Sequence, residues 1–265
     1  RFARLENNNG IDPFTMDRAG YFVDIDANGF KDFISVQYEA IQVFINDGSG
    51  QFSESLFSQI HHERKTFSLA ASDYDVDGDV DLLFTRWGSF YDPAQPLTEY
   101  LWQNQGDGVF FDVSDTVAVD SEPGNLEDSI PEFSFTANFA DIDNDGYPDM
   151  LVSSDFERSQ VLRNEAGLRF IDATVKNVIN DQRGMGGAVG DYDRDGDLDW
   201  FVSSIHEPEG ADADGAMDGN RLYRNADGLG NFEDVTDEAG VREGYWGWGS
   251  CFADFDNDGH LDLFH

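Results

Sequence analysis

Basic side chains are scarce in this sequence. Its 265 residues include 16 Lys and Arg against 54 Asp and Glu, which gives a formal net charge of −38. Proteins that bind nucleic acid need a basic face to neutralise phosphates, and attachment to an anionic membrane by charge alone needs basic residues as well. The composition therefore argues against nucleic-acid binding and against electrostatic membrane binding.

Cysteine and long apolar runs are also scarce. Cys251 is the single cysteine, so an internal disulfide is excluded. No apolar run approaches the ~18 residues of a membrane-spanning helix. Aromatic residues, in contrast, make up 14% of the chain, and they provide a core where high charge alone would indicate disorder. The length suits one large all-β domain or two small domains.

The acidic residues are concentrated in a repeated loop. The chain has 39 Asp and only 15 Glu, a bias typical of turns and of metal-binding loops. Five segments share the pattern Asp-x-Asp-x-Asp/Asn-Gly-x-x-Asp: 24–32 (DIDANGFKD), 73–81 (DYDVDGDVD), 141–149 (DIDNDGYPD), 191–199 (DYDRDGDLD) and 254–262 (DFDNDGHLD). A short apolar run follows each Asp loop, as expected for a strand.

A second motif alternates with the Asp loops. It consists of a short apolar run, an Asn, a turn that contains Gly, and a Phe. Its copies are 5–14 (LENNNGIDPF), 43–52 (VFINDGSGQF), 101–110 (LWQNQGDGVF), 161–170 (VLRNEAGLRF) and 222–232 (LYRNADGLGNF). Gly-containing turns between apolar runs are hairpin signals.

Together the two motifs predict one unit of four short strands, repeated five times. In the third unit we expect strands at 133–140, 150–154, 160–164 and 168–174, with the Asp loop between the first two and the hairpin turn between the last two. Repeated four-stranded units of this length indicate an all-β fold, a β-propeller of four-stranded blades.

The repeat pattern starts and stops within a blade. The chain begins in a hairpin motif and its last Asp loop is followed by only one apolar run, so we expect 1–265 to be a single domain whose first and last units are incomplete. The two halves together would complete one blade and close a five-bladed ring without exposed edges. The alternative is that these repeats belong to a larger propeller.

The Asp loop has the chemistry of a hard-cation site. Ca²⁺ takes six to eight oxygen ligands, and carboxylates at positions 1, 3, 5 and 9 of a loop curled at its Gly can supply them. Without a cation, these carboxylates would repel one another. An EF-hand would need Glu at position 12, where Val152 and Val202 stand, and Zn²⁺ would need His or Cys ligands.

These loops resemble those of the FG-GAP/VCBS repeat family, which includes the propellers of integrin α-subunits. The similarity is carried by GYWGWGSCFADFDNDGHLDLF (244–264), FVDIDANG (22–29), NFADIDNDG (138–146) and AVGDYDRDG (188–196). The resemblance implies a calcium-binding β-propeller with about five Ca²⁺ ions. By motif position, the implied ligands are Asp24, Asp26, Asn28, Asp32, Asp73, Asp75, Asp77, Asp81, Asp141, Asp143, Asp145, Asp149, Asp191, Asp193, Asp195, Asp199, Asp254, Asp256, Asp258 and Asp262.

Aromatic residues outside the Asp loops suggest a second type of site. Trp87, Tyr91, Tyr245, Trp246 and Trp248 suit either a platform that stacks on sugar rings or packing between blades. The sequence contains no nucleophile elbow, phosphate loop or Ser/His/Asp signature.

Three functions fit these observations. The first is a non-catalytic, calcium-stabilised binding or adhesion module with a protein or glycan ligand on its surface loops. The second is a structural subunit of an extracellular assembly, in which incomplete blades pair between copies. The third is a calcium-dependent polysaccharide lyase or another carbohydrate-active enzyme. Weak Asp-loop sites fill at the millimolar Ca²⁺ found outside the cytoplasm, so we expect an extracellular, cell-surface or periplasmic location.

Overall fold

The regular secondary structure of the described residues is almost entirely β-strand. A computed structural model describes residue 11 and residues 17–37, 40–55, 60–61, 66–87, 100–106, 108–114, 117, 133–207 and 217–265. Within this part of the chain, the one α-helix is α1 (Thr236–Ala239). No helix there is long and apolar enough to cross a membrane.

Four sheets repeat the same four-stranded antiparallel meander. The first contains β1 (Asp17–Val23), β2 (Asp32–Gln37), β3 (Ala40–Asn46) and β4 (Phe52–Glu54), with β5 (Ile60–His61) paired to β3. The second contains β6 (Thr66–Ser72), β7 (Asp81–Arg86), β8 (Tyr100–Asn104) and β9 (Phe110–Asp112). The third contains β10 (Ser134–Ala140), β11 (Asp149–Ser154), β12 (Gln160–Asn164) and β13 (Phe170–Asp172). The fourth contains β14 (Gly186–Gly190), β15 (Asp199–Ser203), β18 (Arg221–Asn225) and β19 (Phe232–Asp234).

Two pairs of strands complete the described structure. A small ribbon, β16 (His206–Glu207) with β17 (Met217–Asp218), projects from the fourth sheet, and β20 (Cys251–Ala253) pairs with β21 (Asp262–Phe264). Among the described residues, β20 and β21 pair only with each other. Residues 1–10, which we expect to complete this last blade, lie outside the described residues, so the completed blade and the closed ring stay predictions.

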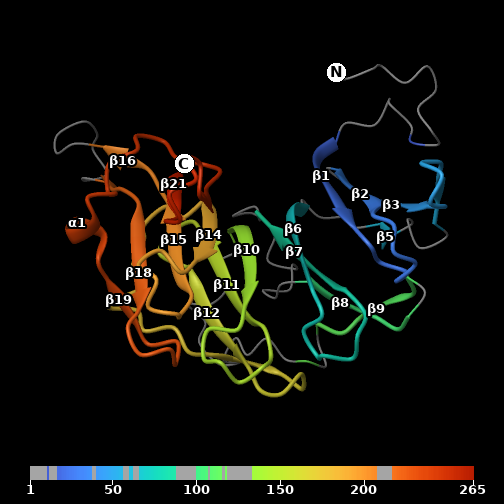
Figure 1. Cartoon of the computed structure of the whole chain (residues 1–265), viewed down its shortest axis with the longest axis horizontal. Helices are drawn as coiled ribbons and strands as arrows, with labels where there is room; N and C mark the ends of the chain where they lie inside the picture. Colours follow the sequence, from blue (N-terminus) through green and yellow to red (C-terminus); the bar gives the residue numbers. More distant parts are fainter. Residues whose placement is uncertain are drawn as a thin grey trace.

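The strand assignments made from the sequence are confirmed. In the third unit, the four expected strands coincide with β10, β11, β12 and β13 to within about two residues at each end. The first strands of successive sheets lie side by side in the order β1, β6, β10, β14, β20. Figure 1 shows the sheets following one another in this order, from blue at the first sheet to red at the last. This arrangement of consecutive meanders is propeller-like.

The hydrophobic core lies between sheets. In β7, Leu82 packs with Ile34 of the first sheet, whereas the adjacent Leu83 packs with Met150 of the third. Both leucines are fully buried. A strand that is covered on both faces reads as a continuous apolar run, because its alternate side chains enter two different cores. This burial explains why apolar runs, not alternating patterns, follow the Asp loops.

Candidate metal sites

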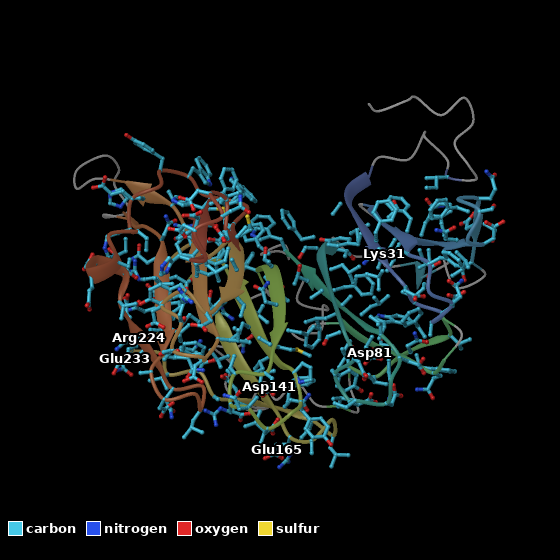
Figure 2. All side chains as sticks on the ribbon, viewed as in Figure 1. Lys31, Asp81, Asp141, Glu165, Arg224 and Glu233 are labelled. Carbon is cyan, nitrogen blue, oxygen red and sulfur yellow. The ribbon has the colours of Figure 1, made fainter. Side chains whose placement is uncertain are left out.

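Each Asp loop joins the first strand of a sheet to the second. The loops therefore occupy the same end of every sheet, which we call the loop end, and the turn between the third and fourth strands lies at that end too. Figure 2 labels Asp81 and Asp141 in two neighbouring sheets, with Glu165 of a hairpin turn beyond them. The five predicted sites are thus presented on one end of the fold.

The backbone of each loop curls around the first aspartate. In the third loop, Asp141 Oδ1 accepts the N–H of Asp145 at 3.1 Å and Oδ2 accepts that of Gly146 at 3.0 Å. The curl requires left-handed backbone at position 4, where Asn144 has φ = 60°, and at position 6, where Gly146 has φ = 94°. Glycine adopts the latter without steric penalty. The same two positions are left-handed in all five loops.

The curled backbone brings three carboxylates together in every loop. One oxygen from each of positions 1, 3 and 9 lies within 4.8 Å of the other two. The five groups are Asp24, Asp26 and Asp32; Asp73, Asp75 and Asp81; Asp141, Asp143 and Asp149; Asp191, Asp193 and Asp199; and Asp254, Asp256 and Asp262. Three converging carboxylate oxygens form the core of an oxygen-only cation site.

The fifth position of the loop has a second role. Asp77, Asp145 and Asp258 each accept the N–H of the residue two positions later, at 2.8–3.0 Å, as do Asn28 and Asp195. Such a bond holds the second half of the loop in a turn. The position-5 side chains are outside the five three-carboxylate groups, so their coordination of a cation stays a prediction.

The ninth aspartate is buried beneath the loop. In the third loop, Asp149 is fully buried and accepts the N–H of Ile142 at 3.0 Å and that of Asn164 at 2.7 Å. The pKa of Asp149 is raised to about 7, and burial is the main cause. The two N–H groups act to lower this pKa, whereas the charges of Asp143 and Asp145 act to raise it. Burial likewise raises the pKa of Asp81 and of Asp199 to about 7.

These sites fit a hard divalent cation. Asp75 Oδ1 and Asp191 Oδ1 are shielded from solvent and accept no hydrogen bond from any described residue. A shielded carboxylate oxygen without a partner is unfavourable, and a nearby cation would compensate for it. The donors are oxygens, which suits Ca²⁺ and not Zn²⁺. The bound ion would offset the repulsion between the carboxylates and hold the loop closed.

The Asn of the hairpin motif connects neighbouring sheets, a role that the sequence did not reveal. Asn164 Nδ2 donates to Tyr74 O in the preceding Asp loop at 2.8 Å, while its N–H binds Asp149 of its own sheet. Asn104 and Asn225 make the same contacts, with Ile25 O and Ile142 O of the preceding loops. The constant position of Asn in the second motif was the one sequence feature that pointed to this role. A side chain with an amide donor is required there, because it must satisfy a carbonyl of the adjacent repeat.

The residue before this Asn differs between repeats. In the second sheet Gln103 donates from Nε2 to Asp75 Oδ2, and in the third sheet Arg163 Nη1 lies 3.7 Å from Asp143 Oδ2. Both partners stand at position 3 of their loops. The third site therefore has a permanent cation beside its carboxylates, whereas the second has a neutral amide.

Four of the five predicted aromatic residues fall in the part of the chain that the structure describes, at the end of the fold opposite the Asp loops. Trp87 and Trp248 both pack against Phe135, with ring centroids 6.2 and 5.3 Å apart. Trp246 is mostly exposed and does not share this contact, and Tyr91 lies outside the described residues. Trp87 and Trp248 therefore pack between sheets, which is the second of the two alternatives that the sequence left open.

The fold and its loops define a class: a propeller-like repeat protein whose units each carry an acidic loop with converging carboxylates. The chain belongs to the FG-GAP-like repeat family, whose sequence pattern matches residues 24–84, 141–202 and 211–265, more than half of the chain. This confirms the resemblance drawn from the Asp loops. The search of curated protein sequences found no match to the chain.

The solved structures that resemble this chain have low sequence identity to it. A lectin from Agrocybe aegerita that recognises non-reducing terminal N-acetylglucosamine has 18% identity and a TM-score of 0.57, and the alignment covers 92% of this chain and 59% of the lectin chain. BBS1N in its complex with ARL6DN has 15% identity, coverages of 84% and 56%, and a TM-score of 0.46. The V. cholerae biofilm matrix protein Bap1 has 13% identity, coverages of 77% and 26%, and a TM-score of 0.42. The present chain therefore spans less than two thirds of each of these chains.

Proposed function

We propose that this chain is a calcium-stabilised binding module that acts outside the cytoplasm. The observation that carries the proposal is the convergence of three carboxylates in each of five identically curled loops. Under this proposal each loop holds one Ca²⁺ ion, with ligands from positions 1, 3, 5 and 9. The ion supplies the charge that lets a buried carboxylate such as Asp149 remain ionised.

Calcium in these loops has a structural role. The hairpin Asn connects each loop to the next sheet, so the conformation of a loop affects the packing between repeats. At ~1 mM Ca²⁺ and a dissociation constant of roughly 10⁻⁵–10⁻⁴ M, each site contributes about 1.4–2.7 kcal/mol. Five sites of that strength contribute about as much as the net stability of a whole domain, roughly 5–15 kcal/mol.

A binding role is favoured by the architecture. A rigid scaffold with metal-stabilised turns suits the presentation of surface loops, which is where binding residues are commonly found. The Agrocybe aegerita lectin shares the fold at a TM-score above 0.5, which supports a glycan as one ligand class for such a scaffold. Protein ligands fit the same scaffold.

A calcium titration tests this proposal. The chelated protein is melted, and Ca²⁺ or Mg²⁺ is then added back while unfolding and binding heat are recorded. We expect a large Ca²⁺-specific rise in melting temperature, about five ions bound, and dissociation constants of roughly 10⁻⁵–10⁻⁴ M. An unchanged melting temperature would contradict calcium stabilisation. Dissociation constants below about 10⁻⁷ M would contradict the location, because such sites fill in the cytoplasm.

A further inference from the structure

Six aromatic side chains gather at the end of the fold opposite the Asp loops. They come from residues at or just before the starts of β6 and β10, from residues just after β7 and β11, and from the segment before β20. The cluster consists of Phe67, Trp87, Phe133, Phe135, Phe156 and Trp248, joined by ring contacts with centroids 4.6–6.2 Å apart. It joins the second, third and last sheets, and we call it the aromatic cluster.

Trp248 is the member with the most accessible ring. It is 48% exposed, although Phe67 stacks against it at 6.2 Å and Phe135 contacts it edge-on at 5.3 Å. Its backbone is held in place, because Trp248 O accepts the hydroxyl of Ser203 at 2.8 Å. A Cβ at Gly186 would lie 1.8 Å from the same carbonyl oxygen, so only glycine fits there. The indole is therefore presented to solvent on a fixed backbone.

A carboxylate and a guanidinium border the cluster. Asp155 Oδ2 accepts the indole N–H of Trp87 at 3.4 Å, and Asp155 Oδ1 lies 3.9 Å from Arg183 Nη1. Arg183 is also placed over the ring of Phe156, 4.8 Å from its centroid. The side chain of Asp155 is 13% exposed and that of Arg183 is 28% exposed, so each retains surface for a ligand. Together they offer both acceptors and donors beside aromatic rings.

The backbone is strained at this same end. Among the described residues, nine non-glycine residues have positive φ; five stand at position 4 of the Asp loops and one lies in a hairpin turn. The remaining three are Phe156, Glu157 and Tyr245, with φ of 61°, 58° and 56°. They follow β11 or precede β20, at the end that bears the aromatic cluster. Strain of this kind collects at ligand-binding sites.

We propose that the aromatic cluster binds a neutral carbohydrate. An apolar sugar face stacks on the exposed indole of Trp248, while Asp155 and Arg183 exchange hydrogen bonds with sugar hydroxyls. The net charge of −38 opposes uronates and sulfated sugars, which selects neutral hexoses or N-acetylated sugars. This inference rests on the proposed binding function and adds a site and a ligand class to it.

Glycan binding by the calcium-loaded chain tests the inference. An array of neutral and acidic glycans is screened first, and the best neutral glycan is then titrated while tryptophan fluorescence is recorded. We expect binding of neutral glycans, with Trp248→Leu and Arg183→Gln each weakening it by about tenfold. Phe111→Ala is the matched control, since Phe111 is an exposed aromatic residue on the outer strand β9, and it should leave affinity unchanged.

Folding is measured on the same variants. Trp248→Leu removes packing, so its melting temperature in Ca²⁺ is compared with that of wild type; Arg183→Gln tests the site without removing an aromatic ring. Loss of affinity in a folded Arg183→Gln variant supports the inference even if Trp248→Leu unfolds. Unchanged affinity in both variants, binding confined to acidic glycans, or no glycan bound at all would overturn it. Calcium stabilisation in that same preparation would leave the proposed function standing.

Discussion

Trp248 stacks on Phe67, with ring centroids 6.2 Å apart and ring planes inclined by 19°. Phe67 belongs to β6 of the second sheet, whereas Trp248 precedes β20 of the last, so this contact joins the two across the intervening sheets. The chain places an aromatic side chain where the first strands of several repeats meet. The two residues are far apart in the sequence, so the contact forms only if the successive sheets curve around to bring them together.

A double-mutant cycle measures this contact. We expect Phe67→Ala and Trp248→Ala to be coupled by about 0.5–1.5 kcal/mol in urea unfolding, the range typical of aromatic pairs. A cycle between Phe67 and Phe111, which lies on an outer strand, provides the uncoupled comparison. Additive effects at Phe67 and Trp248 would show that the two rings do not interact in solution.

Loss of one ligand should remove one calcium ion. Asp149→Ala deletes a carboxylate of the third group together with its hydrogen bonds to Ile142 and Asn164. We expect the bound calcium to fall from five ions to four, and the loss of stability to be larger in Ca²⁺ than in chelator by about 1.4–2.7 kcal/mol. Glu165→Gln removes an equal charge from an exposed hairpin turn and should retain all five ions. Five ions in the Asp149 variant would refute the assigned ligand.

Arg163 should weaken calcium binding at the third site. Its guanidinium lies 3.7 Å from Asp143, so Arg163→Gln removes a competing positive charge and gives the site the residue found in the second sheet. We expect roughly two- to fivefold tighter binding at that site, because partly exposed ion pairs are worth only about 1 kcal/mol or less. The difference should shrink at high salt. Arg169→Gln on the nearby hairpin is the control, and an equal effect there would point to general electrostatics.

The hairpin Asn should contribute to stability both with and without calcium. Asn164→Ala leaves Tyr74 O without its side-chain donor, and we expect a loss of about 1–3 kcal/mol. Asn231→Ala serves as the matched control, because Asn231 is exposed and its amide bonds only locally, to Asp227. Urea unfolding in chelator and in Ca²⁺ separates the two contributions. Equal stability of the two Asn variants would contradict a role in joining the sheets.

The buried Asp181 should make the protein less stable as the pH rises. Burial raises the pKa of Asp181, although Ser159 donates to it at 2.6 Å and Tyr223 at 3.1 Å. A carboxyl whose folded pKa is raised contributes stability that is present below its unfolded pKa of about 3.9 and is lost as the pH rises through the folded value.

The variant Asp181→Asn isolates that effect. The free energy of unfolding of wild type minus that of the variant should decrease as the pH rises above about 4, measured at saturating Ca²⁺. Calcium binding contributes equally to both proteins and cancels in the difference. A difference that stays constant with pH would show that Asp181 does not change its protonation in this range.

The repeat architecture could be predicted from sequence because its signals are local. A nine-residue loop that curls around Asp141 needs glycine at position 6, which is Gly146, and an apolar strand after the loop. The repeated sequence pattern contains both features. Repetition five times removes the ambiguity that a single copy leaves. The same logic gave the ligand candidates at positions 1, 3, 5 and 9, of which the structure brings together positions 1, 3 and 9.

Contacts between repeats could not be predicted in the same way. The bond from Asn164 to Tyr74 O and the stacking of Trp248 on Phe67 depend on how sheets are placed relative to one another, which no local pattern encodes. The pairing of Arg163 with Asp143 joins a hairpin to a loop within one sheet, but it also depends on the strand register. Tertiary contacts, not propensities, therefore determine how the sites differ.

The division of β7 between two cores has a consequence for the length of the array. Because Leu82 and Leu83 face different neighbours, an isolated repeat would leave apolar side chains on both faces of its sheet in water. Duplication of one repeat then adds one complete interface, and deletion of an internal repeat merges two interfaces into one. The number of units is in this sense a thermodynamic variable, because each added unit contributes the stability of one further interface.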